Sequence, residues 1–236
     1  MLTGKIDWEG GMFVGHEAIG LAGRAKFPRI SLGVWLMAVQ FLDLLWPLFL
    51  LLGWEHVRIA PGITRMTPLD FYDYPISHSL VGALAWSAVF ATGYLVLGRT
   101  PREERGRGAL LLGAAVFSHW ILDLLVHRPD LPILPRGPYV GLGLWNVPAA
   151  EILLEGGLFA AGIFLYTKTT RPRDAVGRWG LWSLLAVLLF FWLSGPLGPP
   201  PPSESAVAWL SLVGGWLIPL WGAWIDRHRT LEGGIA

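Results

Sequence analysis

The chain has 236 residues, of which 53% are hydrophobic and only 15% are charged. A soluble globular protein carries about 25% charged residues, so the composition excludes an ordinary soluble domain and indicates an integral membrane protein whose partner is the lipid bilayer. The formal net charge of +1, without a long basic run, argues against nucleic-acid binding, and the absence of cysteine excludes disulfides, thiolate metal sites and a cysteine nucleophile.

The first element in chain order is the short apolar segment 8–23, WEGGMFVGHEAIGLAG. As a helix this segment spans about 24 Å, which is short for a full crossing of the membrane. Two interpretations are open: an amphipathic helix that lies in the membrane interface, or a segment that is embedded in the membrane.

Six long apolar runs follow, and each is close to the roughly 20 residues that a helix needs to cross the hydrocarbon core. They cover 32–53, 79–98, 109–126, 148–166, 179–195 and 206–225. The predicted fold is therefore all-α: a polytopic bundle of six transmembrane helices, together with the short N-terminal segment, in a single membrane domain, 1–236.

The positive charges predict the orientation of this bundle. Fourteen of the 18 Lys and Arg residues fall on one side of the membrane if the six runs cross it. These fourteen lie before residue 32, in the loops 99–107 and 167–178, and after residue 225. Cytoplasmic loops carry an excess of Lys and Arg, so the sequence predicts a multi-pass protein of the inner (cytoplasmic) membrane with a cytoplasmic C-terminus.

Four ionisable side chains stand out inside the predicted spans or at their mouths: Asp43, His78, His119 and Asp123. Each costs about 3 kcal/mol in a bilayer and must therefore be paired, hydrated or bound to a metal. His119 and Asp123 are four residues apart and share one face of a helix. The predicted topology puts all four in the outer half of the membrane, so they can converge in one outward-facing pocket.

These residue types suit a divalent metal ion, with zinc as the expected ion. Neutral imidazole and carboxylate bind Zn²⁺, Mn²⁺ and Fe²⁺, and an ion with an open position activates water and polarises a carbonyl or phosphoryl oxygen. We assign His78, His119 and Asp123 as ligands and Asp43 as a ligand or a catalytic base. Two other interpretations are open: a hydrogen-bonded pair that ties helices together, and a proton or ion relay in a transporter.

Other polar residues are candidates for a role near this site. Glu155 lies deep in the fourth run and is a candidate catalytic residue, whereas Asn146 and Arg128 lie near the outer face and are candidates for substrate binding. Two acids of the outer loop, Asp70 and Asp73, can hydrogen-bond the free ring nitrogen of the nearby ligand histidine.

The chain resembles a known family in the order of four motifs. They are GH (15–16), LDLLWP (42–47), YPISHSL (74–80) and SHWILDLLVHRPDLPI (118–133). This order is similar to that of the bacterial inner-membrane, metal-dependent hydrolase-like family, whose members show an early GH, a PDxDH-like motif, HRGxTHS and SHxxxD. LDLLWP lacks the second acid and the histidine of PDxDH, and YPISHSL lacks the HRG of the third motif.

The resemblance implies a polar set made of His16, Asp43, His78, His119 and Asp123, with His16 as a further metal ligand. If His16 joins the others, segment 8–23 must enter the membrane, and this is the interpretation that we favour.

The predicted function is that of a membrane-bound, metal-dependent hydrolase. Its substrate would be an ester or phosphoester, such as a lipid or envelope intermediate, that reaches an outward-facing site within the membrane. The alternative is a small permease or ion-coupled transporter that uses the same polar cluster. A third interpretation is a non-catalytic membrane scaffold, which would keep its stability if the buried polar residues were replaced by apolar ones.

Overall fold

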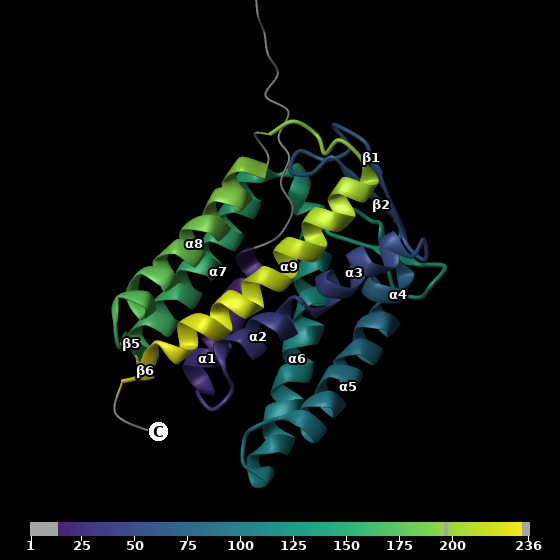
Figure 1. The fold of residues 1–236 in the computed structure, drawn as a ribbon. Coiled ribbons are helices and arrows are strands. Elements are labelled where there is room, and N and C mark those ends of the chain that lie inside the picture. The colour runs from purple at the N-terminus through teal and green to yellow at the C-terminus, as the bar shows by residue number, and fades with distance from the viewer. Residues whose placement is uncertain (1–13, 196–197, 233–236) are drawn as a thin grey trace, which may run out of the picture.

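The computed structural model describes residues 14–195 and 198–232 (Figure 1). These residues form nine α-helices and three small two-stranded sheets. The helices dominate, and several of them are long and apolar enough to cross a membrane. The prediction of an all-α, multi-pass helical bundle is therefore confirmed.

Five of the predicted spans are single long helices. They are α5 (Leu80–Leu97), α6 (Arg102–Val126), α7 (Pro148–Thr169), α8 (Ala175–Ser194) and α9 (Glu204–Arg227). The largest difference from the predicted bounds is at α6, which begins before the apolar run starts. Its first turn carries Glu103 and Glu104, which interact favourably with the positive end of the helix dipole, so the helix continues into polar sequence.

The first predicted span is broken into two helices, and the prediction of one continuous element over 32–53 was wrong in this respect. Helices α2 (Leu32–Val39) and α3 (Phe41–Leu51) meet at Gln40 with a bend of 56°. Pro47 lies inside α3 and offers no N–H to the carbonyl four residues earlier. Non-helical backbone at membrane depth is tolerated where protein surrounds it, and Gln40 is buried and donates a hydrogen bond to Glu17 Oε1 at 3.0 Å.

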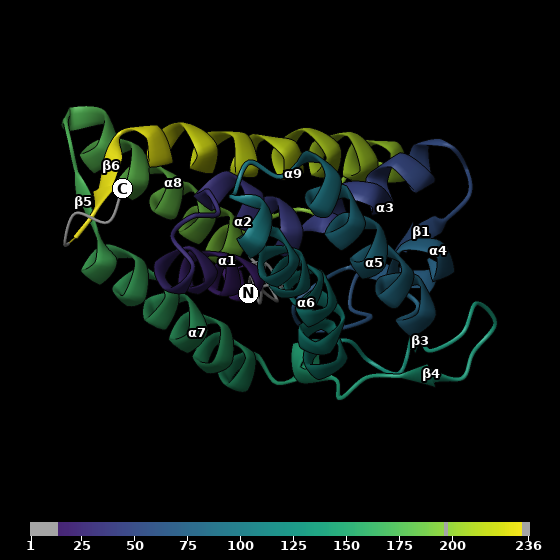
Figure 2. The same cartoon turned by 90° about the horizontal axis from the view of Figure 1, so that it is seen from below.

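Helix α1 (Val14–Lys26) lies inside the bundle, where it contacts α7 and α2 (Figure 2). Most of its residues are buried, so the part of the predicted segment from 14 to 23 does not lie on the surface of the protein. Residues 8–13 of that segment lie outside the described residues. Helix α7 approaches α1 closely at Gly162, where an added Cβ would lie 2.7 Å from the carbonyl oxygen of Ala18. Small residues allow such close helix packing in membranes.

Short strands and turns occupy both ends of the bundle. Strand β1 (His56–Ile59) pairs antiparallel with β2 (Leu69–Asp73), and β3 (Leu131–Pro132) with β4 (Tyr139–Val140). The short helix α4 (Pro75–His78) and the 3-10 turn η1 (Leu144–Asn146) belong to the same end. At the opposite end β5 (Thr170–Pro172) pairs with β6 (Arg229–Leu231).

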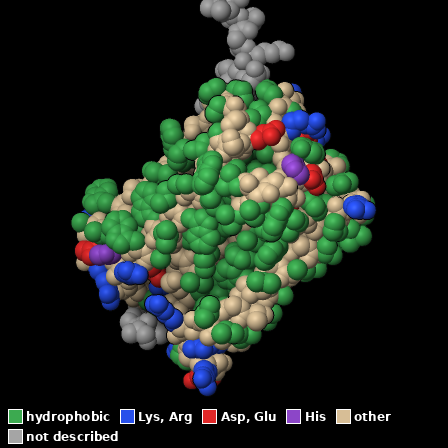
Figure 3. Space-filling model, turned by 45° about the vertical axis from the view of Figure 1, so that its right-hand side comes forward, with side chains coloured by type: hydrophobic (Ala, Val, Ile, Leu, Met, Phe, Trp, Pro, Cys, Tyr) green, Lys and Arg blue, Asp and Glu red, His purple; other side chains and the backbone are tan. Residues whose placement is uncertain are grey.

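Loops that were predicted to share one side of the membrane lie together in space. At the lower end in Figure 1, an ion pair joins Arg29 to Glu104. At the upper end, Arg58 and Arg128 both bind Asp70. Figure 3 shows a broad apolar surface between these charged ends, as expected for a protein that is surrounded by lipid.

A buried ion pair connects the first helices to the last one. Arg24 Nε lies 2.9 Å from Asp226 Oδ1, and Asp226 Oδ2 also accepts a hydrogen bond from the backbone N–H of Leu32 at 3.2 Å. The side chains of Arg24 and Asp226 are only 8% and 10% exposed. Asp226 therefore holds the ends of α1 and α2 against α9.

We expect Asp226→Ala to lower the free energy of unfolding by about 3–5 kcal/mol, because it leaves the Arg24 guanidinium buried without a counter-charge. Denaturant unfolding of the purified protein in detergent measures this loss. The double variant Arg24→Met, Asp226→Leu removes both charges and is expected to recover most of the stability. Equal losses in the single and double variants would contradict the prediction.

Candidate metal centre

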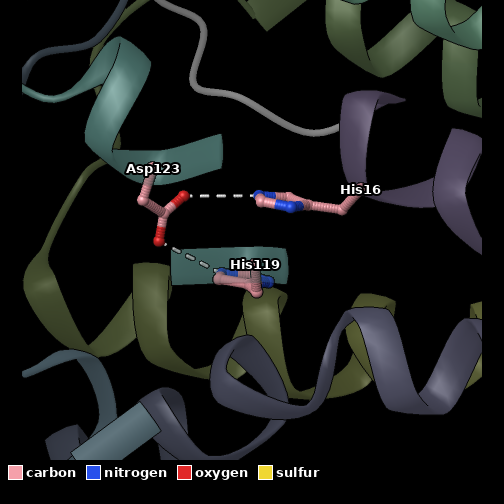
Figure 4. Close-up of side chains that lie close together, drawn as sticks. All are labelled: His16, His119 and Asp123. Atoms are coloured by element: carbon pink, nitrogen blue, oxygen red, sulfur yellow. Dashed lines mark ion pairs between the residues drawn. The ribbon is translucent and has the colours of Figure 1, made fainter. Parts of the chain in front are cut away.

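Five of the predicted site residues come together, from four helices. They are His16 on α1, Asp43 on α3, His78 on α4, and His119 and Asp123 on α6. Their ligand atoms form two groups of three, each within 4.8 Å: His16, His119 and Asp123, and Asp43, His78 and His119. Figure 4 shows the first group, with both imidazoles directed at the Asp123 carboxylate. His119 belongs to both groups and lies at the centre of the cluster.

Four His–Asp separations in the cluster can be compared with those around a bound metal ion. His78 Nε2 lies 3.3 Å from Asp43 Oδ1 and 3.8 Å from Asp123 Oδ2. His119 Nε2 lies 3.6 Å and 3.3 Å from the same two oxygens. Zinc with ligands at 2.0–2.1 Å in a tetrahedron separates them by roughly 3.3 Å. The four His–Asp separations are therefore close to the value that such an ion requires.

The break in the first span orients His119. Its Nδ1 lies 2.7 Å from the carbonyl oxygen of Val39, the last residue of α2, and the final carbonyls of a helix have no partner within it. A carbonyl oxygen only accepts hydrogen bonds, so His119 Nδ1 carries a proton. In the neutral ring the lone pair is then on Nε2, the atom that faces Asp43 and Asp123.

His78 is held by a group that the sequence analysis did not identify. Its Nδ1 lies 2.7 Å from Ser77 Oγ, which donates a hydrogen bond to Glu55 Oε2 at 2.6 Å. Burial raises the pKa of the Glu55 carboxyl, and its hydrogen bonds to Ser77 act in the opposite direction. Tyr74 packs against the His78 ring, and burial raises the pKa of its phenol well above the usual value, so the hydroxyl stays protonated.

The prediction that Asp70 or Asp73 contacts the ring nitrogen of His78 was wrong. Asp70 accepts hydrogen bonds from Arg58 and Arg128, and Asp73 lies 2.8 Å from His56 Nδ1. These five charged or titratable residues pair with one another across β1, β2 and the loop after α6, because opposite charges on neighbouring strands and loops neutralise one another there.

His16 and Asp123 have polar atoms without hydrogen-bond partners among the described residues. His16 Nε2 lies 3.3 Å from Asp123 Oδ1, and the ring stacks on that of His119 with centroids 3.8 Å apart. Both ring nitrogens of His16 and Asp123 Oδ2 are buried and make no hydrogen bond in the part of the chain that is described. Buried polar atoms of this kind are costly unless a ligand, ion or water satisfies them.

The cluster is closed on most sides. His16 and His119 are 1% exposed and His78 and Asp123 are 4% exposed, whereas the side chain of Asp43 is 39% exposed. Access to the cluster therefore passes Asp43. With neutral rings, three imidazoles and two carboxylates have a formal charge of −2, which matches a divalent cation, and the Nε2 atoms of His78 and His119 lie 3.3–3.8 Å from the carboxylate oxygens that would share it.

The other predicted site residues are not part of either ligand group. Arg128 lies at the upper end of the bundle, where it binds Asp130 at 2.9 Å as well as Asp70. Asn146 is exposed in η1, and Glu155 is buried in α7. Their assigned roles in substrate binding and catalysis remain predictions.

Comparisons with known proteins give no match: no family model, no curated protein and no solved structure matches the chain. The resemblance to the metal-dependent hydrolase-like family therefore remains a prediction. Conclusions about the chemistry of the cluster rest on its geometry alone.

The close approach of α7 to α1, which positions His16, can be tested with two glycines of the same helix. Gly162→Ala is expected to lower the free energy of unfolding by about 1–3 kcal/mol, because its Cβ meets the Ala18 backbone. Gly157→Ala meets no atom within 4 Å and is expected to raise stability by about 0.5–1 kcal/mol, since alanine is the better helix former. Thermal or denaturant unfolding measures both, and changes of the same sign would contradict the packing.

Proposed function

We propose that the chain is a membrane-bound hydrolase that depends on a divalent metal ion and cleaves an ester or phosphoester at this cluster. The observation that carries the proposal is the arrangement of His78 and His119, whose Nε2 lone pairs face the carboxylates of Asp43 and Asp123 at 3.3–3.8 Å. With the rings neutral, these lone pairs and carboxylate oxygens are all acceptors directed at a common space, and imidazole and carboxylate are ligands that zinc prefers.

Each residue of the cluster has a role in this proposal. His78, His119 and Asp123 hold the ion, and His16 either adds a ligand or steadies the second oxygen of Asp123. Asp43, the exposed member, is the general base that removes a proton from the attacking water. A bound zinc ion supplies the other half of the chemistry, since it lowers the pKa of water and polarises the scissile ester or phosphoryl group.

The surface next to Asp43, the exposed member of the cluster, suits a lipid-like substrate. Phe41, two residues before Asp43, contacts Trp86 and Phe90 of α5, and little of α5 is buried inside the protein. An amphiphile with its ester near the headgroup level can approach Asp43 along such an apolar flank. The distribution of Lys and Arg supports a cytoplasmic C-terminus in the inner membrane, and the site then faces outward.

A small permease or ion-coupled transporter is the second candidate. The broken span α2–α3, whose break provides the Val39 carbonyl to the cluster, favours it, because discontinuous helices commonly form the ion and substrate sites of transporters.

Two assays separate these candidates. Release of a hydrolysis product in detergent solution, where no sealed compartment exists, supports the hydrolase. Ion-dependent uptake of a solute into sealed vesicles, without any hydrolysis product, supports the transporter.

Metal analysis of the purified protein tests the metal centre. We expect a stoichiometric divalent ion in the wild type and its loss in His119→Gln. A site that binds zinc also raises thermal stability, by about 2.7 kcal/mol at a free concentration of 100 times Kd. His228→Gln is the matched control, because His228 pairs with Asp174 at the β5–β6 end. A wild type that contains no such ion and is not stabilised by zinc would refute the proposal.

Asp43→Asn tests the catalytic step. This variant keeps the three proposed ligands but removes the base, so we expect zinc to remain bound while the turnover number falls roughly 10²–10⁴-fold. Phosphate release from short-chain phosphatidic acid and cleavage of a long-chain p-nitrophenyl ester are suitable assays. Unchanged turnover in Asp43→Asn would remove Asp43 from the mechanism.

A further inference from the structure

A buried carboxylate lies behind His78, outside the proposed ligand set. Glu55 follows α3 in the loop that leads to β1 and is only 1% exposed. Its Oε1 accepts hydrogen bonds from the backbone N–H groups of Ile76 and Ser77, each at 2.7 Å. Its Oε2 accepts the hydroxyl hydrogen of Ser77 at 2.6 Å. All the hydrogen bonds of this carboxylate are thus made to the short helix that ends at His78.

In the hydrogen-bond chain from Glu55 through Ser77 to His78, each donor and acceptor can be assigned. A serine hydroxyl has one hydrogen, and Ser77 donates it to the carboxylate of Glu55. Ser77 Oγ must then accept from His78 Nδ1, which lies 2.7 Å away. The neutral His78 ring therefore carries its proton on Nδ1 and its lone pair on Nε2, which is the atom 3.3 Å from Asp43 Oδ1.

We propose that Glu55 and Ser77 are positioning residues that hold His78 in the Nδ1–H tautomer, so that Nε2 is free to bind a metal ion. This inference rests on the proposed metal function. Partners that hydrogen-bond the second nitrogen of a ligand histidine fix its tautomer and orientation, and their loss weakens metal binding roughly 10- to 100-fold. The Val39 carbonyl oxygen fixes the tautomer of His119 in the same way, by accepting a hydrogen bond from Nδ1. Both central histidines therefore direct Nε2 towards the cluster.

The competing explanation is that Glu55 only caps the short helix α4. Glu55→Gln separates the two roles. The two backbone N–H donors hold the amide oxygen of the glutamine in the place of Oε1, and the amide NH₂ then takes the place of Oε2. This NH₂ group donates to Ser77 Oγ, which frees the serine hydrogen for donation to His78 Nδ1, and we then expect the proton of His78 to move to Nε2. The cap is kept while the tautomer is reversed.

The neighbouring Glu204 offers a matched control. Glu204 and Glu55 both line a groove of about 240 Å³ between the end of α3, β1 and the start of α9. Glu204 is exposed and is the first residue of α9, and among the described residues it makes no hydrogen bond to Ser77 or His78. Glu204→Gln therefore changes the charge of the groove without changing the hydrogen-bond chain.

The test uses the full chain in detergent or nanodiscs, labelled with ¹⁵N-histidine. The chain has only six histidines, and the spectrum of His78→Asn identifies the His78 signals. In the metal-free wild type and in Glu204→Gln we expect His78 to be protonated on Nδ1. In Glu55→Gln we expect protonation on Nε2, an unchanged melting temperature of the metal-free protein, and a zinc affinity that is lower by roughly 10- to 100-fold.

Two serine variants add a test of rescue. Ser77→Ala breaks the chain and is expected to weaken zinc binding, whereas Ser77→Thr keeps the hydroxyl and is expected to restore most of the affinity. Protonation of His78 on Nε2 in the wild type, or a Glu55→Gln variant with the wild-type tautomer and affinity, would overturn the inference. If the wild type binds no zinc but Glu55→Gln still reverses the tautomer, the metal function fails while the hydrogen-bond chain is supported.

Discussion

The hydrogen bond from His119 Nδ1 to the Val39 carbonyl oxygen joins the break in the first span to the ring that both ligand groups share. A continuous helix through Gln40 would use its carbonyls internally and would offer none to a side chain at this depth. The break is therefore more than a defect in a transmembrane helix. It supplies the acceptor that orients His119, whose Nε2 then faces both Asp43 and Asp123.

The cluster also explains why a short helix lies inside a bundle of long ones. Helix α1 brings His16 against Asp123 and Glu17 against Gln40, so it contributes polar groups to the cluster and to the bend at the same time. Buried polar groups in a membrane are stabilised mainly by partners on neighbouring helices. The close contact of α1 with α7 at Gly162 therefore serves to keep these partners in register.

The sequence predicts the spans and the central residues because lipid imposes strong constraints. An ionisable residue in an apolar run is costly, so Asp43, His119 and Asp123 were identifiable without coordinates. The bend at Gln40 was not, since neither glycine nor proline marks it and hydropathy continues through it. Glu55 was also missed: beside His56 in a polar loop it has the pattern of a surface residue, and only the folding of the loop onto α4 buries it.

The contact of Asp226 with Arg24 and Leu32 spans about two hundred residues of sequence. During synthesis, helices α1 and α2 leave the ribosome long before α9, so Arg24 and the backbone N–H of Leu32 gain this carboxylate only after α9 has been made. Until then, the Arg24 side chain is more stable when hydrated at the membrane surface, which keeps α1 close to that surface. Burial of His16 beside Asp123 would thus be one of the last events of assembly, and the polar centre would be completed only once the final helix has been inserted.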